Sequence, residues 1–182
     1  MKKELKKLAF GFLIAFLDFR LGTFNILPDI IGYLMIYSAL SNFSPTENGR
    51  LAKGAALFLA IFSLPDIIMP PQLTLDHMGT IHFGWQLYTS VLHLVQVFLV
   101  VNVLKALSII VNEQGFYSEK KWLENFGKVY LIVNLILIFM GPVGYLFSFE
   151  LLFLVGFSFI VGFIIHVIFI VRLFQIRAKV FK

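Results

Sequence analysis

The chain has 182 residues, 59% hydrophobic and 14% charged, and its mean hydropathy is +0.90. Soluble domains are about a quarter charged and about half apolar, so this composition indicates an integral membrane protein. Cysteine is absent, which excludes disulfides, thiolate metal sites and cysteine nucleophiles, and we expect neither a metal nor a cofactor.

The N-terminal segment has four lysines in its first seven residues, followed by an apolar run over residues 8–17. A secretory signal peptide has the same order, but a small-x-small cleavage site would follow it. Here Asp18, Phe19 and Arg20 follow instead. The sequence therefore predicts a retained first span over residues 6–21, with Asp18 within about one turn of its outer end.

Five more apolar segments follow, separated by polar or turn-forming residues. They predict an all-α, single-domain protein of six transmembrane helices. Pro28 suits the first position of the second helix, where the N–H that proline lacks is not needed. Residues 112–128 are the longest polar stretch, and we expect them to form a connection. The spans after the first are expected at residues 28–43, 50–69, 83–110, 129–146 and 150–172.

The basic residues predict the orientation of the chain. With the N-terminus in the cytoplasm, fourteen of the 15 lysines and arginines fall in cytoplasmic segments, and only Arg20 lies outside. Cytoplasmic segments of membrane proteins carry such an excess. We therefore expect both termini in the cytoplasm, and we attribute the net charge of +5 to topology rather than to a nucleic-acid partner.

A short motif lies at the start of the second predicted span. It reads Asn25-Ile26-Leu27-Pro28-Asp29, then Ile31-Gly32-Tyr33. Residues 24–40 resemble the start of a family of small multi-spanning membrane proteins, common in Gram-positive bacteria, with an Ile-Leu-Pro-Asp-x-Ile-Gly-Tyr signature. The resemblance covers about two spans. It implies a bacterial plasma membrane and names no reaction, because no activity is assigned to that family.

The outer ends of the first three spans carry Asp18, Asp29 and Asp66, with Arg20 nearby. Carboxylates are costly in apolar surroundings and often functional, so these four residues are candidates for a cation or amine site. A local explanation also exists for each aspartate. Asp29 would lie in a first helical turn, where the helix dipole favours negative charge, Asp18 would pair with Arg20, and Asp66 would lie at headgroup level.

Residues 64–68 repeat the Leu-Pro-Asp-Ile-Ile of residues 27–31, which leaves an internal repeat as an open alternative. Because the second and third spans are expected to be antiparallel neighbours, we expect Asp29 and Asp66 to face one another. Pro65 has no N–H, so it should leave the carbonyl of Ile61 without its helical partner.

The fourth span carries a polar stripe within about a third of the helix circumference. We expect this stripe to face inward, with His93 buried against the second, third or sixth span and Leu94 and Val101 facing lipid. One hypothesis is a ligand-binding or proton-carrying face, with Gln86, His93 and Gln96 as contacts. The alternative is hydrogen bonding between helices. The members of the stripe are His82, Gln86, Thr89, Ser90, His93 and Gln96.

In the sixth span Ser158, Gly162 and His166 are four residues apart, a spacing that favours close helix packing. Asn134 is expected to make a hydrogen bond within the bundle. Gly141 and Pro142 either break the fifth span or end it.

Catalytic motifs such as His-Glu-x-x-His and Gly-x-Ser-x-Gly are absent, so we expect a protein that is not an enzyme. The expected function is binding or transport of an ion or a small polar or cationic molecule through an outward-opening polar cavity. The alternative is a non-catalytic accessory or scaffold subunit of a larger membrane complex. Expected partners are the lipid bilayer and either another membrane protein or further copies of the chain.

Overall fold

The structure, a computed structural model, describes residues 1–16, 20–21, 24–25, 29–43, 45–65, 83–144 and 149–180. Within these ranges the chain is helical apart from one pair of two-residue strands and short turns. In that pair β1 (Arg20–Leu21) runs antiparallel to β2 (Phe24–Asn25), with Arg20 opposite Asn25. The all-α fold class predicted from the sequence is confirmed.

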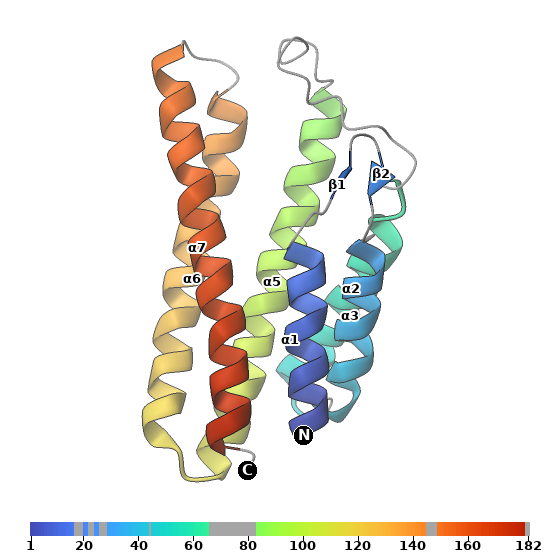
Figure 1. Cartoon of the computed structure of the whole chain (residues 1–182), viewed down its shortest axis with the longest axis vertical. Helices are drawn as coiled ribbons and strands as arrows, with labels where there is room; N and C mark the ends of the chain where they lie inside the picture. The colour runs from blue at the N-terminus through green and yellow to red at the C-terminus, as the bar shows by residue number, and fades with distance from the viewer. Residues whose placement is uncertain are drawn as a thin grey trace.

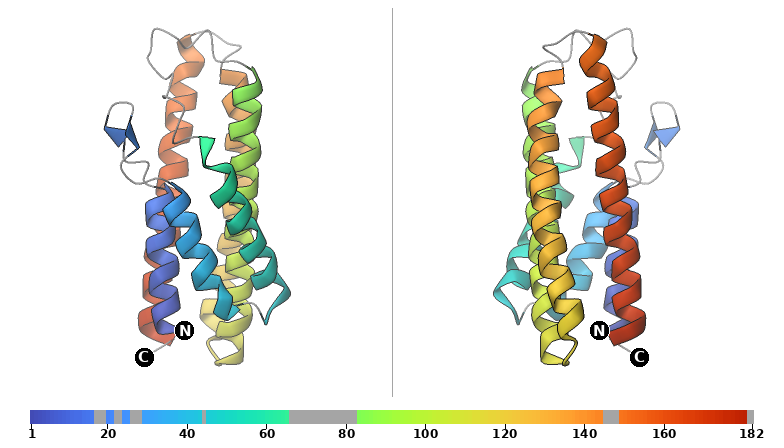
Figure 2. Two further views of the ribbon diagram at one scale, coloured as in Figure 1. Left: turned by 90° about the vertical axis from the view of Figure 1, so that its right-hand side faces the viewer. Right: turned by 90° about the vertical axis from the view of Figure 1, so that its left-hand side faces the viewer.

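Six α-helices are present in the described ranges (Figure 1). The helices lie side by side, and both termini and the α5–α6 turn are at one end of the bundle, here called the termini end (Figures 1 and 2). A 3-10 turn, η1 (Leu40–Phe43), extends the second helix. The bounds are α1 Lys2–Phe16, α2 Asp29–Ala39, α3 Glu47–Phe62, α5 Phe83–Glu113, α6 Tyr117–Gly144 and α7 Phe149–Val180.

The helices fall into two length classes. The helices α5, α6 and α7 have 31, 28 and 32 residues, which at 1.5 Å per residue is about 42–48 Å. Among the described residues, three helices are long and apolar enough to cross a membrane, over Leu87–Glu113, Tyr117–Phe139 and Ile160–Val180. The described parts of α1, α2 and α3 have 15, 11 and 16 residues, or about 17–24 Å.

Most of the polar stretch over residues 112–128 is helical, and the turn between α5 and α6 takes only residues 114–116. The helix α5 ends at Glu113, and just beyond it Gly115 has a φ of +81°, which suits glycine, while the Phe116 N–H donates to the Val111 carbonyl (3.1 Å). This six-to-one bond defines a Schellman ending, which closes a helix within two residues. The helix α6 starts at once with Tyr117, so most of the stretch forms its first three turns. The polarity reflects a helix surface rather than a connection.

The C-terminal ends of α7 and α6 also bear on the sequence predictions. The first differs from its predicted position, and the second decides between two alternatives for Gly141 and Pro142. The helix α7 continues to Val180, eight residues beyond the predicted end at residue 172. The backbone of α6 is helical through Gly141 and Pro142 to Gly144, so this Gly-Pro segment ends the helix and does not interrupt it.

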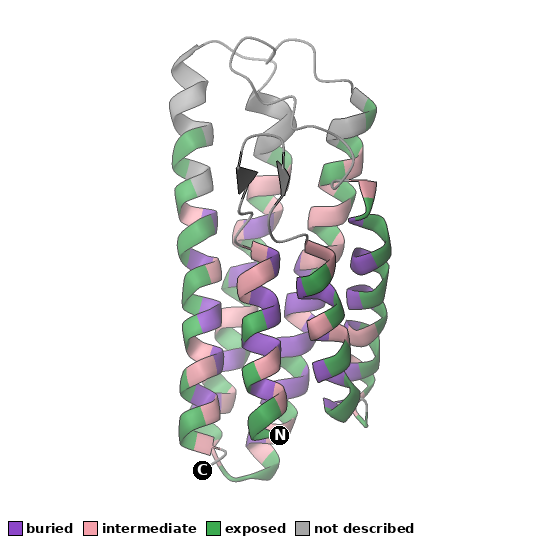
Figure 3. Ribbon diagram, turned by 45° about the vertical axis from the view of Figure 1, so that its right-hand side comes forward, coloured by how far each residue is buried: buried purple, intermediate pink, exposed green. Residues whose placement is uncertain are grey.

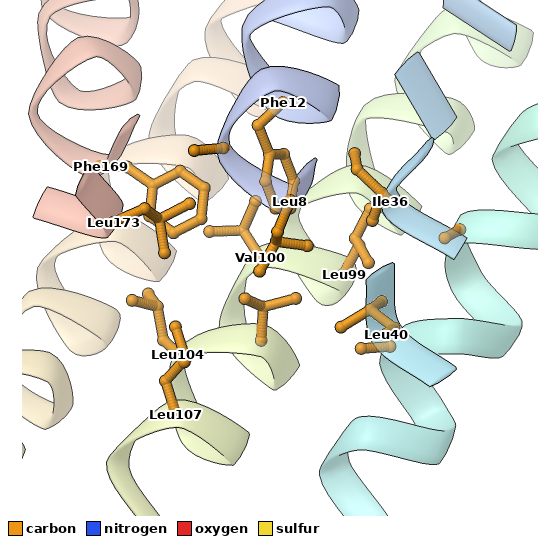
Figure 4. Packing of buried hydrophobic residues seen from close by; sticks show 14 of the residues in the cluster. Leu8, Phe12, Ile36, Leu40, Leu99, Val100, Leu104, Leu107, Phe169 and Leu173 are labelled. Carbon is orange, nitrogen blue, oxygen red and sulfur yellow. The ribbon is translucent and has the colours of Figure 1, made fainter. Parts of the chain in front are cut away.

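The core lies between α1, α2, α5 and α7 (Figure 4). Phe12 of α1 meets Phe169 of α7 edge to face, with ring centroids 4.9 Å apart. Buried positions follow the sides of the helices that face one another (Figure 3). At the centre lie Leu8, Phe12, Ile36, Leu40, Leu99, Val100, Leu104, Phe169 and Leu173.

Large apolar side chains are also exposed on the outside of all six helices. A water-soluble monomer rarely carries an apolar surface of this extent. Examples are Phe10, Leu34, Phe58, Ile61, Leu87, Leu94, Ile132, Ile136, Phe157, Phe163 and Val171.

The positive charges gather toward the termini end. Every lysine and arginine in the six described helices lies in the half of its helix nearer that end. The basic residues of the described helices therefore gather toward one end of the bundle. The predicted orientation requires such a distribution.

Candidate functional site

Polar side chains join α5, α6 and α7 along a line of four hydrogen bonds, and we call His93, Tyr130, Asn134 and His166 the polar cluster. His93 Nε2 lies 3.1 Å from Asn134 Oδ1, and Asn134 Nδ2 donates to the Tyr130 carbonyl at 2.8 Å. The Tyr130 hydroxyl lies 2.9 Å from His166 Nε2, and His166 Nδ1 lies 2.6 Å from the Gly162 carbonyl. Tyr130 and Asn134 are fully buried, and the two histidines are half-buried.

Helical spacing explains the arrangement of the polar cluster. Tyr130 and Asn134 are four residues apart, so they share one face of α6. On α7 a Cβ at Gly162 would lie 2.9 Å from Leu137 Cδ1, which shows how closely α6 and α7 pack there. The small residue at Gly162 therefore serves helix packing, and its carbonyl also holds His166.

His93 points toward the bundle, but its hydrogen bond goes to α6, the fifth predicted span. The sequence instead predicts that His93 packs against the second, third or sixth span. On the opposite side of α5 Leu94 is 48% exposed, as predicted, whereas Val101 is half-buried.

The inward face of α5 changes character along its length. At 100° per residue Ser90, His93 and Gln96 share this face with Val97, Val100 and Leu104. The three apolar residues are at most 2% exposed, whereas the three polar ones are half-buried. The face is therefore dry and apolar toward the termini end and polar and partly open in its other half.

Some polar groups on this face have no hydrogen-bond partner within the described part of the chain. They are Nδ1 of His93, the side-chain amide of Gln96 and the hydroxyl of Ser90. An unpaired polar group is costly at membrane depth, so these atoms require water or a bound molecule. We call Ser90, His93 and Gln96 the open polar face.

The other predicted site residues are placed only in part. Asp29 is the first residue of α2 and half-buried, a position where the helix dipole favours its charge. Arg20 lies in β1 and Gln86 in α5, but their side chains are outside the described part of the structure. Asp18 and Asp66 lie outside the described residues altogether, and so does the expected approach of Asp29 to Asp66.

The expectation of a free carbonyl at Ile61 was wrong. The Leu64 N–H donates to it at 3.3 Å, because the end of α3 tightens into a turn. The next carbonyl, of Phe62, accepts from the Tyr88 hydroxyl of α5. Both acceptors near Pro65 are therefore used, one locally and one to fasten α3 to α5.

A buried ion cluster near the termini end was missed by the sequence interpretation. Glu119 is 4% exposed and accepts from Arg172 Nη2 (2.6 Å) and Lys179 Nζ (2.5 Å). The Arg172 guanidinium also lies over the Trp122 ring, 4.4 Å from its centroid. The available signal is that Arg172 and Lys179 are seven residues apart on one helix face. Their partner could not be found in this way, because Glu119 lies in a polar stretch outside the predicted spans.

The polar cluster is not a continuous proton path. His93 and His166 each bond to a side chain of α6, but Asn134 connects onward to a backbone carbonyl and not to the Tyr130 hydroxyl. An amide does not pass a proton to a carbonyl oxygen, so the two histidines form separate units.

No protein-family model, curated protein or solved structure matches the chain.

Proposed function

We propose that this chain is a six-span protein of a bacterial plasma membrane, with both termini in the cytoplasm, that binds a small polar molecule or ion from the outer side. The binding surface is the open polar face of α5, and transport across the membrane is the activity that this site would serve. We also propose that the ligand contacts five residues on its way to this face: Asp18, Arg20, Asp29, Asp66 and Gln86.

The surface and the charges of the bundle support the membrane part of this proposal. Within the described ranges three helices are long and apolar enough to cross a bilayer, and large apolar side chains are exposed on all six described helices. The basic residues gather toward the termini end, which is the cytoplasmic side by the positive-inside rule. The opposite end, to which the open polar face is nearer, is then the outer side.

One observation carries the binding part. The same face of α5 is sealed by apolar packing at Val97 and Val100 but keeps partly exposed, unpaired polar atoms at His93 and Gln96. Hydrogen bonding between helices alone, the structural alternative, would pair these atoms with neighbouring helices. Intramembrane ionisable residues that face a wet surface commonly mark ligand or ion pathways.

Cysteine accessibility tests the proposal, because the native chain has no cysteine and each introduced thiol is unique. Ser90→Cys and Gln96→Cys are treated with a membrane-impermeant maleimide in intact cells. The matched controls are Leu94→Cys, on the exposed apolar side of the same helix, and Val97→Cys, in the sealed part of the face.

We expect labelling at positions 90 and 96 and none at 94 or 97, because maleimide reacts with thiolates in contact with water. Failure to label at both 90 and 96 would overturn the binding face and leave the accessory-subunit alternative. Labelling at 94 would contradict a lipid-facing surface.

A further inference from the structure

We infer that the two histidines of the polar cluster are held in opposite tautomers, so that His93 offers a bare Nδ1 to the open polar face and selects a hydrogen-bond donor such as an amine. The tautomers follow from the geometry alone. The ligand class rests on the proposed function.

His166 is fixed by a carbonyl. Its Nδ1 lies 2.6 Å from the Gly162 carbonyl oxygen, which can only accept, so Nδ1 carries the hydrogen. In the neutral ring Nε2 is then an acceptor, and the Tyr130 hydroxyl at 2.9 Å donates to it. Both ring nitrogens and the hydroxyl hydrogen are satisfied in this state.

His93 is fixed through Asn134. The Tyr130 carbonyl can only accept, so the Asn134 atom 2.8 Å from it is the amide nitrogen, and Oδ1 points to His93. That oxygen also only accepts, so His93 Nε2 at 3.1 Å carries the hydrogen. In the neutral ring Nδ1 keeps its lone pair, and within the described residues no donor is bonded to it. Asn134 is thus a positioning residue for His93.

The residue types of the open polar face, and the charges that the sequence places at the outer ends of the first three predicted spans, agree with a donor or cation as ligand. Lysine and arginine are absent from the polar stripe of α5. By sequence, the outer ends of the first three predicted spans contribute three aspartates and a single arginine, Arg20. An anion could bond only to the Gln96 amide N–H groups and the Ser90 hydroxyl, and the bare Nδ1 of His93 would repel it, whereas an alkylammonium ion could donate to that nitrogen, to the amide oxygen and to the hydroxyl.

The tautomers are measurable by nitrogen NMR of the full chain in lipid bilayers, labelled with ¹⁵N-histidine, at a pH where the rings are neutral. His77 and His82, the other two histidines, are replaced by glutamine so that two rings remain. Protonated and bare ring nitrogens resonate in well-separated regions. We expect His93 bare at Nδ1 and His166 bare at Nε2; a shared tautomer overturns the inference.

The variant Asn134→Leu tests whether Asn134 positions the His93 ring or only stabilises the fold. This variant should redistribute the His93 tautomers toward a mixture and leave His166 unchanged, because the Gly162 carbonyl still holds it. Tyr130→Phe should leave both tautomers in place. A His93 signal that is unchanged in Asn134→Leu would show that Asn134 does not position the ring.

The ligand class is tested on the same labelled protein with methylammonium and with acetate. Methylammonium should shift the His93 Nδ1 signal in a saturable way and leave His166 unaffected, and acetate should shift neither. A response to acetate, or none to methylammonium, overturns the donor assignment. If maleimide still labels Ser90→Cys in that case, the open face stands and only the ligand class fails; without labelling, the proposed function fails as well.

Discussion

Gly11 of α1 and Gly32 of α2 lie in backbone contact where the two helices cross. A Cβ on Gly32 would lie 2.8 Å from the Gly11 carbonyl oxygen and 2.7 Å from the Ala15 nitrogen. Neither backbone atom can move aside cheaply. The glycine of the Ile-Leu-Pro-Asp-x-Ile-Gly-Tyr motif therefore has a packing role, and the next residue, Tyr33, is buried beside it.

Replacing either glycine of this crossing by alanine should destabilise the bundle. We expect Gly11→Ala and Gly32→Ala each to lose about 1–3 kcal/mol, the usual cost of overpacking, in thermal unfolding in detergent. The control is Gly54→Ala on α3, where a new Cβ meets nothing within 4 Å. That variant should be neutral or stabilised by up to about 1 kcal/mol, since alanine favours helix. Equal losses at all three sites would contradict the crossing.

The buried carboxylate of Glu119 should matter far more than a surface one. Glu119→Gln leaves Arg172 largely buried beside a neutral partner, so we expect a loss of about 3 kcal/mol in unfolding free energy. The matched control is Glu124→Gln, because Glu124 is half-exposed and its distance to Lys120 is 3.9 Å. The control should change stability by less than about 1 kcal/mol. A comparable loss in both variants would show that Glu119 is not a buried anchor between α6 and α7.

The Tyr130 hydroxyl should contribute a single buried hydrogen bond. Tyr130→Phe keeps the buried ring but removes the donor to His166 Nε2, so we expect a loss of about 1–3 kcal/mol, the cost of an unsatisfied buried acceptor. Tyr117→Phe is the control, because Tyr117 is 71% exposed. It should stay within about 0.5 kcal/mol of the native chain. An equally small effect at Tyr130 would show that water replaces the lost donor.

The orientation of the chain is testable with two single cysteines. Gln114, exposed in the α5–α6 turn, is expected in the cytoplasm, and Gln72, which lies outside the described residues, is expected outside. An impermeant maleimide should label Gln72→Cys in intact cells and Gln114→Cys only after permeabilisation. The reverse pattern would invert the topology. Gly49 is unsuitable for this purpose, because a Cβ there would lie 1.9 Å from the Phe43 carbonyl oxygen.

Helix position was predicted better than helix length. Apolar runs and turn clusters located every helix of the described chain, because membrane-like hydropathy is a property of local composition. The ends of α5, α6 and α7 were misjudged, since charged residues on a helix surface look like a loop in sequence. Only the Schellman ending at Gly115 distinguishes a loop from two helices joined by a short turn. This signal is hard to recognise in the sequence because it occupies only two residues.

The sequence by itself determined the helical class, the concentration of positive charge toward one end and the side of α5 that carries polar residues. These features depend on composition and on the 3.6-residue helical repeat. Both can be recognised in the sequence without knowing which helices pack against one another. Only the tertiary structure decided that Asn134 holds His93, that Tyr130 holds His166 and that Glu119 is buried between two cations. Those contacts join residues 36 to 60 positions apart in the chain, and helix packing sets their geometry. The direction of each hydrogen bond, and hence the bare nitrogen of His93, follows from that packing.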